Sequence, residues 1–377
     1  MADRPRSRSV APSAPRGPSR RRGLRRLVIG AGTAAAVGAA AYAAEKLAVG
    51  RLRARPDPEG GEALGTLPPE DLGPVRSFDG TEIAVRAAGP RDGPALVFAH
   101  GISLDMTTWY YQWRAFSDRY RCVLFDHRAH GRSGKPPSGD YSLLAMGRDV
   151  KHVLDAAVPE GPAVLIGHSM GGMALVALAR EHPEEFGGRV AGVVLTDTAV
   201  SDLLTELLGS LGVRAGAALR RVGARFADRL DSAERIMRGV RRYGADLSFL
   251  VAWMTNFGPG ASPSQVEYVT RLAQDAPVEV WIHTLQDILS IDLREALEHV
   301  AVPTLVIVGD RDLVTPKTTA QALRAALPDA RAVAVAGAGH VSMMERHLVW
   351  NDVVGDYLSG VLDARPGPHR RKAAAGR

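Results

Sequence analysis

The stretch Ala163-Val164-Leu165-Ile166-Gly167-His168-Ser169-Met170-Gly171-Gly172 decides the fold of this 377-residue chain. Its first four residues predict a buried strand, and the run from Met173 to Arg180 that follows is rich in helix formers. Between them stands Gly-x-Ser-x-Gly, in which small residues let strand and helix approach closely and force the serine into a strained conformation. We therefore expect a strand, a sharp turn and a helix, with the side chain of Ser169 projecting from the turn.

A serine hydroxyl is a weak nucleophile, so a catalytic serine needs a base beside it and an acid that orients the base. Residues 304–308, Thr-Leu-Val-Ile-Val, predict a buried strand that opens into a loop containing Asp312. Residues 332–336, Ala-Val-Ala-Val-Ala, predict another strand, and the small residues after it leave the imidazole of His340 unobstructed. We interpret Ser169, Asp312 and His340 as nucleophile, acid and base.

Other residues near these positions offer alternatives. Asp310 lies two residues before Asp312 in the same loop, and Asp197 follows a further predicted strand. We prefer Asp312 as the acid. Two histidines, His100 and His168, flank the predicted site, and their positions in the motifs favour loop packing and hydrogen bonding over proton transfer.

The chain order serine, aspartate, histidine is that of α/β-hydrolases and differs from the orders in chymotrypsin and subtilisin. Residues 96–101, Leu-Val-Phe-Ala-His-Gly, resemble the third strand and oxyanion loop of that superfamily, and residues 123–134 resemble its next strand and loop. The match departs at Ala129, where relatives usually carry glycine. Over residues 75–362 the chain thus resembles the α/β-hydrolase superfamily, in its capped esterase- and lipase-like branch.

The resemblance implies an α/β-hydrolase fold, a mostly parallel sheet flanked by helices, with its core in residues 70–199 and 300–362. Between these halves, residues 200–299 have helical periodicity and no repeated strand pattern. We expect this insertion to form a helical cap over Ser169.

The resemblance also implies a reaction. The backbone N–H groups of Ile102 and Met170 would form the oxyanion hole of a serine hydrolase that cleaves carboxylic esters through an acyl-enzyme on Ser169. Epoxide hydrolases and haloalkane dehalogenases are disfavoured, since they place an aspartate at the serine position. A cofactor-free perhydrolase or haloperoxidase-like enzyme, a carbon–carbon bond hydrolase, an acyltransferase and a non-catalytic ligand-binding protein remain alternatives.

Apolar and aromatic residues predict the wall of a substrate pocket. Such residues suit an acyl chain or a bulky hydrophobic alcohol, although aromatic residues at helical spacing are as often ordinary core. We expect a small hydrophobic ester, bound by four cap residues and two residues below the cap: Trp253, Met254, Phe257, Trp281, Trp109 and Tyr110.

The N-terminal region is typical of a membrane or export segment. Residues 1–26 hold nine arginines against one aspartate, and residues 27–44 carry no charge. A basic flank before an apolar stretch predicts a cytoplasmic N-terminus and a hydrolase domain outside the cytoplasm. Because so short a stretch of mostly alanine and glycine inserts weakly, a cleaved signal and a secreted enzyme are the alternative to the membrane anchor that we favour. Residues 45–69 would be a linker.

The net charge of +6 is concentrated at the two ends of the chain. Residues 1–55 carry thirteen basic and two acidic residues, and residues 365–377 carry five basic and none acidic, which leaves −10 for the rest. An acidic body argues against nucleic acid as a partner. The tails, residues 1–26 and 363–377, have the composition of disordered segments.

The sequence gives no support for a metal or a cofactor. It contains no His-Glu-x-x-His motif and no Cys-x-x-Cys motif. Gly30-Ala31-Gly32 matches the start of a dinucleotide fingerprint, but an arginine cluster precedes it and an Ala/Gly-rich run continues after it. We therefore expect a reaction without metal or cofactor.

Overall fold

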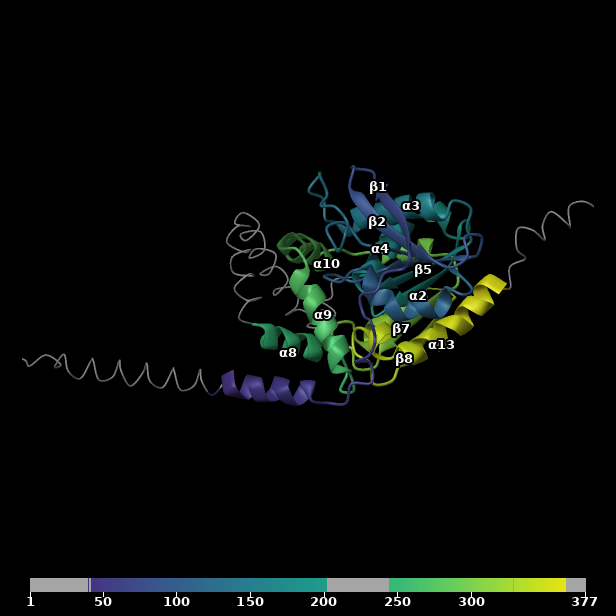
Figure 1. Ribbon diagram of the computed structural model, residues 1–377. Coiled ribbons are helices and arrows are strands. Elements are labelled where there is room, and N and C mark those ends of the chain that lie inside the picture. Colours follow the sequence, from purple (N-terminus) through teal and green to yellow (C-terminus); the bar gives the residue numbers. More distant parts are fainter. Residues whose placement is uncertain (1–39, 41, 202–243, 328, 364–377) are drawn as a thin grey trace, which may run out of the picture. The chain divides into compact units, whose positions relative to one another are not determined.

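The computed structural model describes residues 40, 42–201, 244–327 and 329–363. The chain divides into two compact units, Met1–Leu52, whose described residues 40 and 42–52 are helical, and Arg53–Arg377. The second unit holds an eight-stranded sheet in the order β1-β2-β4-β3-β5-β6-β7-β8 (Figure 1). Its strands are β1 Glu70–Arg76, β2 Glu82–Ala88, β3 Ala95–Ala99, β4 Arg121–Phe125, β5 Ala163–His168, β6 Val190–Thr196, β7 Thr304–Gly309 and β8 Ala330–Val335.

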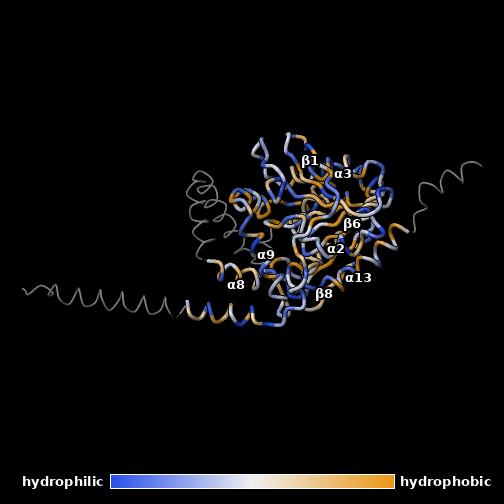
Figure 2. The backbone as a smooth tube through the Cα atoms, viewed as in Figure 1, coloured by the Kyte–Doolittle hydropathy of each residue, from blue (hydrophilic) through white to orange (hydrophobic). Residues whose placement is uncertain are grey.

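The sheet is mostly parallel, which confirms the predicted fold class. Strand β2 pairs antiparallel with β1 and β4, and every other neighbouring pair is parallel. The five strands from β3 to β7 are buried along their whole length, because helices cover both faces of a parallel sheet. Figure 2 shows the apolar residues gathered on these central strands.

Helices flank the sheet on both sides. Side chains of α3 (Leu143–Ala157), α4 (Met170–Glu181) and α11 (Lys317–Ala326) share one buried apolar cluster with the strands. Helices α2 (Tyr110–Phe116) and α13 (His347–Leu358) contact each other and lie away from α3 in Figure 1. The remaining short elements of the core are η1 Met106–Trp109, η2 Pro183–Glu185, η4 Glu295–His299, α12 Ser342–Glu345 and η5 Ser359–Asp363.

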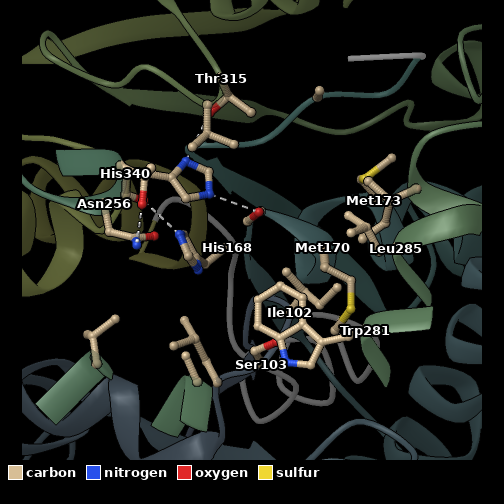
Figure 3. A pocket seen from close by; sticks show the side chains of 18 of the residues that line it. Ile102, Ser103, His168, Met170, Met173, Asn256, Trp281, Leu285, Thr315 and His340 are labelled. Carbon is tan, nitrogen blue, oxygen red and sulfur yellow. Dashed lines mark hydrogen bonds between the residues drawn. The ribbon is translucent and has the colours of Figure 1, made fainter. Parts of the chain in front are cut away.

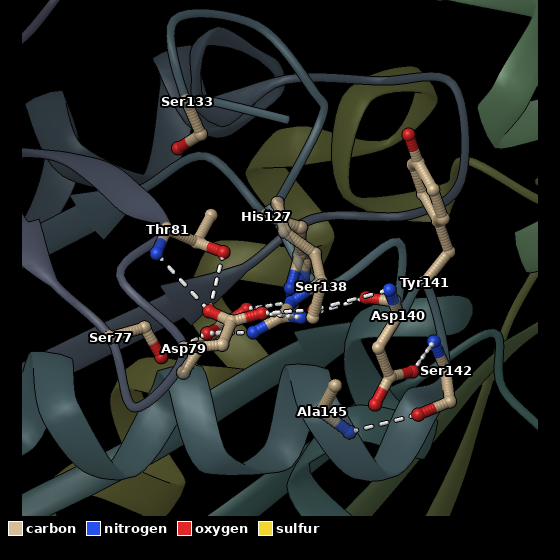
Figure 4. Close-up of polar contacts among 12 residues, drawn as sticks. Ser77, Asp79, Thr81, His127, Ser133, Ser138, Asp140, Tyr141, Ser142 and Ala145 are labelled. Atoms are coloured by element: carbon tan, nitrogen blue, oxygen red, sulfur yellow. Dashed lines mark hydrogen bonds and ion pairs between the residues drawn. The ribbon is translucent and has the colours of Figure 1, made fainter. Parts of the chain in front are cut away.

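A buried ion pair between Arg128 and Asp149 fixes the long loop between β4 and α3. Figure 4 shows other polar contacts of this region, including those of Asp79 with Thr81 and of Ser142 with Ala145. The Arg128 guanidinium donates to both carboxylate oxygens of Asp149, each at 2.7 Å, and to Asp79 at 3.1 Å. Such a bidentate pair fixes orientation as well as charge. Next to the ion pair, the backbone N–H of His127 donates to His100 Nε2 at 3.0 Å. Through this hydrogen bond, the ion pair also stabilises the loop that follows β3.

The described part of the cap consists of helices over the carboxyl ends of the strands: α8 Ala245–Asn256, α9 Pro263–Asp275, η3 Val280–Thr284 and α10 Leu285–Ile288. Residues 202–243 of the predicted cap lie outside the described residues. The chain returns to the core before the predicted boundary at residue 299, since Ile288, Leu293 and Leu297 are buried in the same apolar cluster as α3 and α4.

The predicted linker, residues 45–69, differs from a free connector. Residues 42–53 are helical, and the segment that follows is hydrogen-bonded to both cap and core. Asp57 accepts from the N–H and the hydroxyl of Ser264 at the start of α9, at 3.2 and 2.8 Å. Glu59 accepts from the Tyr111 hydroxyl at 3.0 Å and Glu62 from the Tyr110 hydroxyl at 2.8 Å. We call residues 53–65 the strap.

The predicted membrane segment is almost entirely outside the structure. Of residues 27–44, only 40 and 42–44 are described, and within the described ranges no helix has the length and apolar character needed to cross a bilayer. The predicted tails, residues 1–26 and 363–377, also lie outside the described residues, except Asp363, which ends η5. Anchor, signal and location stay predictions.

Candidate active site

Ser169 occupies a strained turn between β5 and α4. Its backbone has φ 50° and ψ −119°, a conformation that L-residues rarely adopt. The neighbouring glycines make the turn possible: a Cβ on Gly171 would lie 2.2 Å from the carbonyl oxygen of Ala99, and one on Gly172 would lie 2.7 Å from Thr198 Oγ1. The predicted strand, turn and helix are all present, and close backbone packing explains the small residues.

The three residues interpreted as nucleophile, base and acid form one hydrogen-bonded series. His340 Nε2 lies 3.0 Å from Ser169 Oγ, and His340 Nδ1 lies 2.9 Å from Asp312 Oδ2. The side chains come from the ends of β5, β7 and β8, separated by up to 171 residues. An imidazole held in this way has Nδ1–H facing the carboxylate and Nε2 free to accept the serine proton.

The surroundings of Asp312 keep it ionised. Its Oδ1 accepts the N–H groups of Val314 and Thr315 at 2.7 and 2.9 Å, and its Oδ2 accepts the Thr315 hydroxyl at 2.6 Å. Burial acts to raise the pKa of Asp312, but His340 and these donors outweigh it and lower the pKa below its ordinary value. Burial likewise acts to lower the pKa of His340, and the Asp312 carboxylate reverses this and raises it.

The alternative acids are engaged elsewhere. Asp197 accepts the Gly309 N–H at 2.8 Å and both the N–H and the hydroxyl of Ser342, at 3.0 and 2.6 Å. Burial, and then the charge of Asp312, raise the pKa of Asp197 to about 8. Asp310 accepts the Gly337 N–H at 2.7 Å. Among the described residues, Asp312 is the carboxylate that hydrogen-bonds to His340.

The predicted oxyanion donors, Ile102 and Met170, both border the cavity beside Ser169. In the described part of the chain neither backbone N–H donates to a protein acceptor. Met170 is the first residue of α4, where an N–H has no partner within the helix. His100 holds the opposite loop, since its Nε2 accepts the His127 N–H and its Nδ1 donates to the Gly101 carbonyl at 2.8 Å.

His168 forms a hydrogen bond, as its position in the motif predicts. Its Nε2 donates to the carbonyl oxygen of His340 at 2.8 Å, and its ring borders the cavity. Burial, followed by the nearby His340, lowers the pKa of His168 to about 3, so the ring is neutral at ordinary pH. A neutral ring that donates through Nε2 supports the base without competing for its proton. The sequence predicts hydrogen bonding for His168 but not this partner, which lies 172 residues away.

A cavity of about 420 Å³ opens onto Ser169 Oγ and His340. Figure 3 shows His340, His168 and Asn256 on one side of it and Met173, Leu285 and Trp281 on the other. Most of its wall is apolar, and among the described residues no aspartate, glutamate, lysine or arginine lines it. The lining comes from the core and the cap: Ile102, Ser103, Leu104, His168, Ser169, Met170, Met173, Ala199, Thr255, Asn256, Val269, Ala273, Trp281, Leu285, Ile288, Leu289, Leu313, Val314, Thr315 and His340.

The predicted pocket residues need correction. Trp281 lines the cavity, but the other five, Trp253, Met254, Phe257, Trp109 and Tyr110, are not among its lining residues. Trp109 is fully buried between Phe98 and Trp350, with ring centroids 5.2 and 6.0 Å away. Tyr110 donates its hydroxyl to the strap, Trp253 lies under the Arg55 guanidinium, and Met254 is 56% exposed. Phe257 is buried at the end of α8.

Comparison with known proteins identifies the family. The sequence model of the alpha/beta hydrolase fold matches residues 94–347, more than half of the chain. The chain belongs to this family, and the protein is an enzyme with the α/β-hydrolase fold.

Three relatives illustrate the range of activities. A non-heme chloroperoxidase of Streptomyces lividans is 31% identical over 259 residues, which cover 65% of this chain and 84% of the relative. A 3-oxoadipate enol-lactonase 2 of Acinetobacter baylyi is 27% identical over 270 residues, 71% of this chain and 89% of the relative. A thermophilic esterase from Thermogutta terrifontis has a similar structure, with a TM-score of 0.63, 25% identity, and coverage of 78% of this chain and 99% of the esterase.

Proposed function

We propose that the protein is a serine hydrolase of carboxylic esters that forms an acyl-enzyme on Ser169. The observation that carries this proposal is the hydrogen-bonded series Ser169, His340 and Asp312 at the wall of an apolar cavity. The relatives named as an esterase and an enol-lactonase support it, because a lactone is a cyclic ester.

In acylation, Ser169 Oγ attacks the carbonyl carbon of the ester while its proton passes to His340 Nε2. The carbonyl electrons move onto oxygen, and the N–H groups of Ile102 and Met170 stabilise this oxyanion. When the intermediate collapses, the bond to the alcohol oxygen breaks and His340 gives its proton to the leaving alcohol. Asp312 stabilises the imidazolium throughout.

Deacylation repeats these steps with water. His340 Nε2 takes one water proton as the water oxygen attacks the acyl carbon, and the same two N–H groups stabilise the second oxyanion. The bond to Ser169 Oγ then breaks, and the proton on His340 returns to the serine. The acid leaves and the resting enzyme is restored.

The cavity favours an uncharged, apolar substrate. A charged group would lose its hydration without an ionic partner in the described wall, which is costly. Apolar side chains such as Met173, Leu285 and Trp281 instead contact an acyl chain favourably. We therefore propose a hydrophobic ester, with the acyl group against these residues.

Perhydrolysis is the second candidate, because the 31% identical relative is named a chloroperoxidase. Hydrogen peroxide would take the place of water in deacylation, and its oxygen would attack the acyl carbon to release a peracid. The same three side chains would serve both reactions.

Labelling with a fluorophosphonate, followed by a series of p-nitrophenyl esters of increasing acyl length, tests the proposal. We expect covalent labelling at Ser169 and ester turnover, and we expect Ser169→Ala to lose both, with kcat lower by about a millionfold. Folded protein that fails to label at Ser169 would indicate a ligand-binding protein. Labelling without ester turnover would indicate perhydrolysis, carbon–carbon cleavage or acyl transfer, and peroxide with acetate separates the first of these.

A further inference from the structure

Hydrogen bonds hold the chain on both sides of His340, and one of them reaches the cap directly. The N–H of Gly339, just before His340, donates to Glu345 Oε2 at 2.7 Å. The N–H of Val341, just after His340, donates to the carbonyl oxygen of Asn256 at 3.1 Å. Asn256 is the last residue of cap helix α8, so the backbone beside the base is bound directly to the cap.

A single oxygen of Glu345 joins the two parts. Glu345 Oε2 also accepts the N–H of Gly258 at 2.9 Å, and Gly258 belongs to the loop between α8 and α9. One carboxylate oxygen thus receives one N–H from the cap and one from the residue before His340. Glu345 is only 8% exposed, and hydrogen bonds to a buried carboxylate are stronger than those between neutral groups.

The backbones of the cap and of the loop before His340 are in direct contact at the same place. A Cβ on Gly258 would lie 2.1 Å from the carbonyl oxygen of Gly337, and one on Gly339 would lie 2.6 Å from the carbonyl oxygen of Asn256. Any side chain at either glycine would push the two segments apart. We call Asn256–Gly258 with Gly337–Val341 and Glu345 the cap junction.

The cap junction also adjoins the cavity. Thr255 and Asn256 line the cavity wall near the end of α8, and His340 lines it from the other side of the junction. A displacement of α8 would therefore move both a wall of the cavity and the backbone that carries the base. Misplacement of a catalytic group by about 1 Å can cost about a hundredfold in rate.

We propose that Glu345 is a positioning residue that couples the position of cap helix α8 to the position of the His340 imidazole. When the cap is seated, the carboxylate holds Gly258 and Gly339 together and His340 stays aligned with Ser169. When the cap shifts, the base loses that alignment. Seating of the cap over the cavity would thus set the activity of the base. This coupling rests on the proposed function only in the experiments that measure ester turnover.

Two matched pairs of variants test the coupling. Glu345→Asp keeps the charge but is too short to reach both N–H groups, whereas Glu345→Gln keeps the length and one acceptor oxygen. Gly258→Ala forces its Cβ against backbone, whereas a Cβ at Gly260 would meet only the movable end of Arg346, at 2.8 Å. For a short soluble ester we expect Glu345→Asp and Gly258→Ala to lower kcat by about ten- to a hundredfold. Glu345→Gln and Gly260→Ala should keep kcat within about threefold of the wild-type value. KM should change little in all four variants.

The downfield proton resonance of His340 Nδ1–H reports the alignment without turnover. This resonance should broaden or shift in Glu345→Asp and Gly258→Ala and persist in the control variants Glu345→Gln and Gly260→Ala. Thermal melts should show that all four variants fold. Wild-type kcat and an unchanged resonance in Glu345→Asp and Gly258→Ala would overturn the proposal, as would equal losses in Gly258→Ala and Gly260→Ala. If wild type cleaves no ester but the resonance responds as expected, the coupling stands and the proposed function fails.

Discussion

Two carboxyl groups, Asp312 and Asp197, lie near His340, and their environments give them different properties. Asp312 is bound by His340 and three further hydrogen bonds, which favour the ionised form. Asp197 is fully buried and close to Asp312, and two carboxylates in one buried site cannot both ionise easily. Burial and the charge of Asp312 raise the pKa of Asp197 above its ordinary value, and its described hydrogen-bond donors are Gly309 and Ser342.

This difference predicts unequal effects of two matched substitutions. Asp312→Asn should lower kcat by about a thousandfold or more, because an amide cannot stabilise the imidazolium. Asp197→Asn should cost less than about tenfold, because the hydrogen bonds of Asp197 are to Gly309 and Ser342 rather than to His340. Steady-state kinetics on a p-nitrophenyl ester checks both. The reverse order of effects would show that Asp197 is the acid.

The pH dependence of the rate gives a second test of the Asp312→Asn variant, because the direction of its shift can be predicted. Ester cleavage needs neutral His340, so activity is lost as pH falls through the pKa of His340. The Asp312 carboxylate raises that pKa. In Asp312→Asn the residual activity should therefore persist to lower pH than in wild type.

At the residue scale, sequence motifs located the polar residues of the site better than its apolar wall. Ser169, Asp312 and His340 follow strands, and strand ends in a parallel sheet meet at one edge, so their proximity could be predicted. The orientation of an aromatic residue depends on helix packing, which sequence spacing does not define. Trp109 therefore lies in the core, whereas Trp281 lines the cavity. Glu345 had no signal, because its role depends on contacts with Gly258 across 87 residues.

At the element scale, the turn between β5 and α4 depends on close backbone contact between elements. Its helix begins against β3, where the Ala99 carbonyl leaves no room for a side chain at Gly171. At Ala129 the constraint is on backbone conformation. This residue has φ 62°, in the left-handed region, at the position where the sequence departs from the usual glycine. Ala129 can still form the turn, because the left-handed conformation costs a residue with a methyl side chain only about 1–2 kcal/mol.

Glycine-to-alanine substitutions should separate conformational preference from steric contact. Gly171→Ala should destabilise the fold by several kcal/mol and abolish ester cleavage, since the clash is with backbone that cannot rotate away. Gly360→Ala in η5, where an added Cβ meets nothing within 4 Å, should leave both unchanged. Thermal melts and labelling of Ser169 measure the two effects. A Gly171→Ala protein as stable and reactive as wild type would contradict the role of the contact.

The central elements of the sheet could be predicted more fully than the side formed by β1 and β2. Strands β3, β5 and β7 have buried patterns without interruption, and the sequence shows continuous apolar runs there. Strands β1 and β2 carry partly exposed residues and were covered only by the general extent of the family resemblance. An edge strand is defined by its partner, and its residues need not be apolar on both faces.

At the scale of the whole molecule, the strap is the main departure from the expected organisation. It contacts the cap through Arg55, which donates to the Pro259 carbonyl at 2.8 Å, and through Asp57 at the start of α9. It contacts the core through Glu59 and Glu62. A composition rich in charge, proline and glycine suggests a linker, but here the charged groups find partners that are distant in sequence.

Because the strap contacts cap and core at once, releasing either end should loosen the cap. Helix α9 lines the cavity through Val269 and Ala273, so a looser cap should weaken binding of long acyl groups before short ones. The double variant Arg55→Ala/Asp57→Ala loses cap contacts, and Glu59→Ala/Glu62→Ala loses core contacts. Each partly exposed hydrogen bond contributes about 1 kcal/mol, so KM for a long-chain ester should rise about five- to thirtyfold in both.

The chain provides a control in which an exposed ion pair is lost away from the strap. Arg91→Ala removes a contact with Glu70 on β1 and should leave KM unchanged for every ester, since such pairs contribute little. Acetyl ester kinetics should be nearly the same in all variants, because a short acyl group has little apolar surface to bury against the cap. If only the cap-side double variant raised KM, the strap would act locally on α9. Equal rises in both double variants, confined to long acyl chains, require a strap that joins the cap to the core.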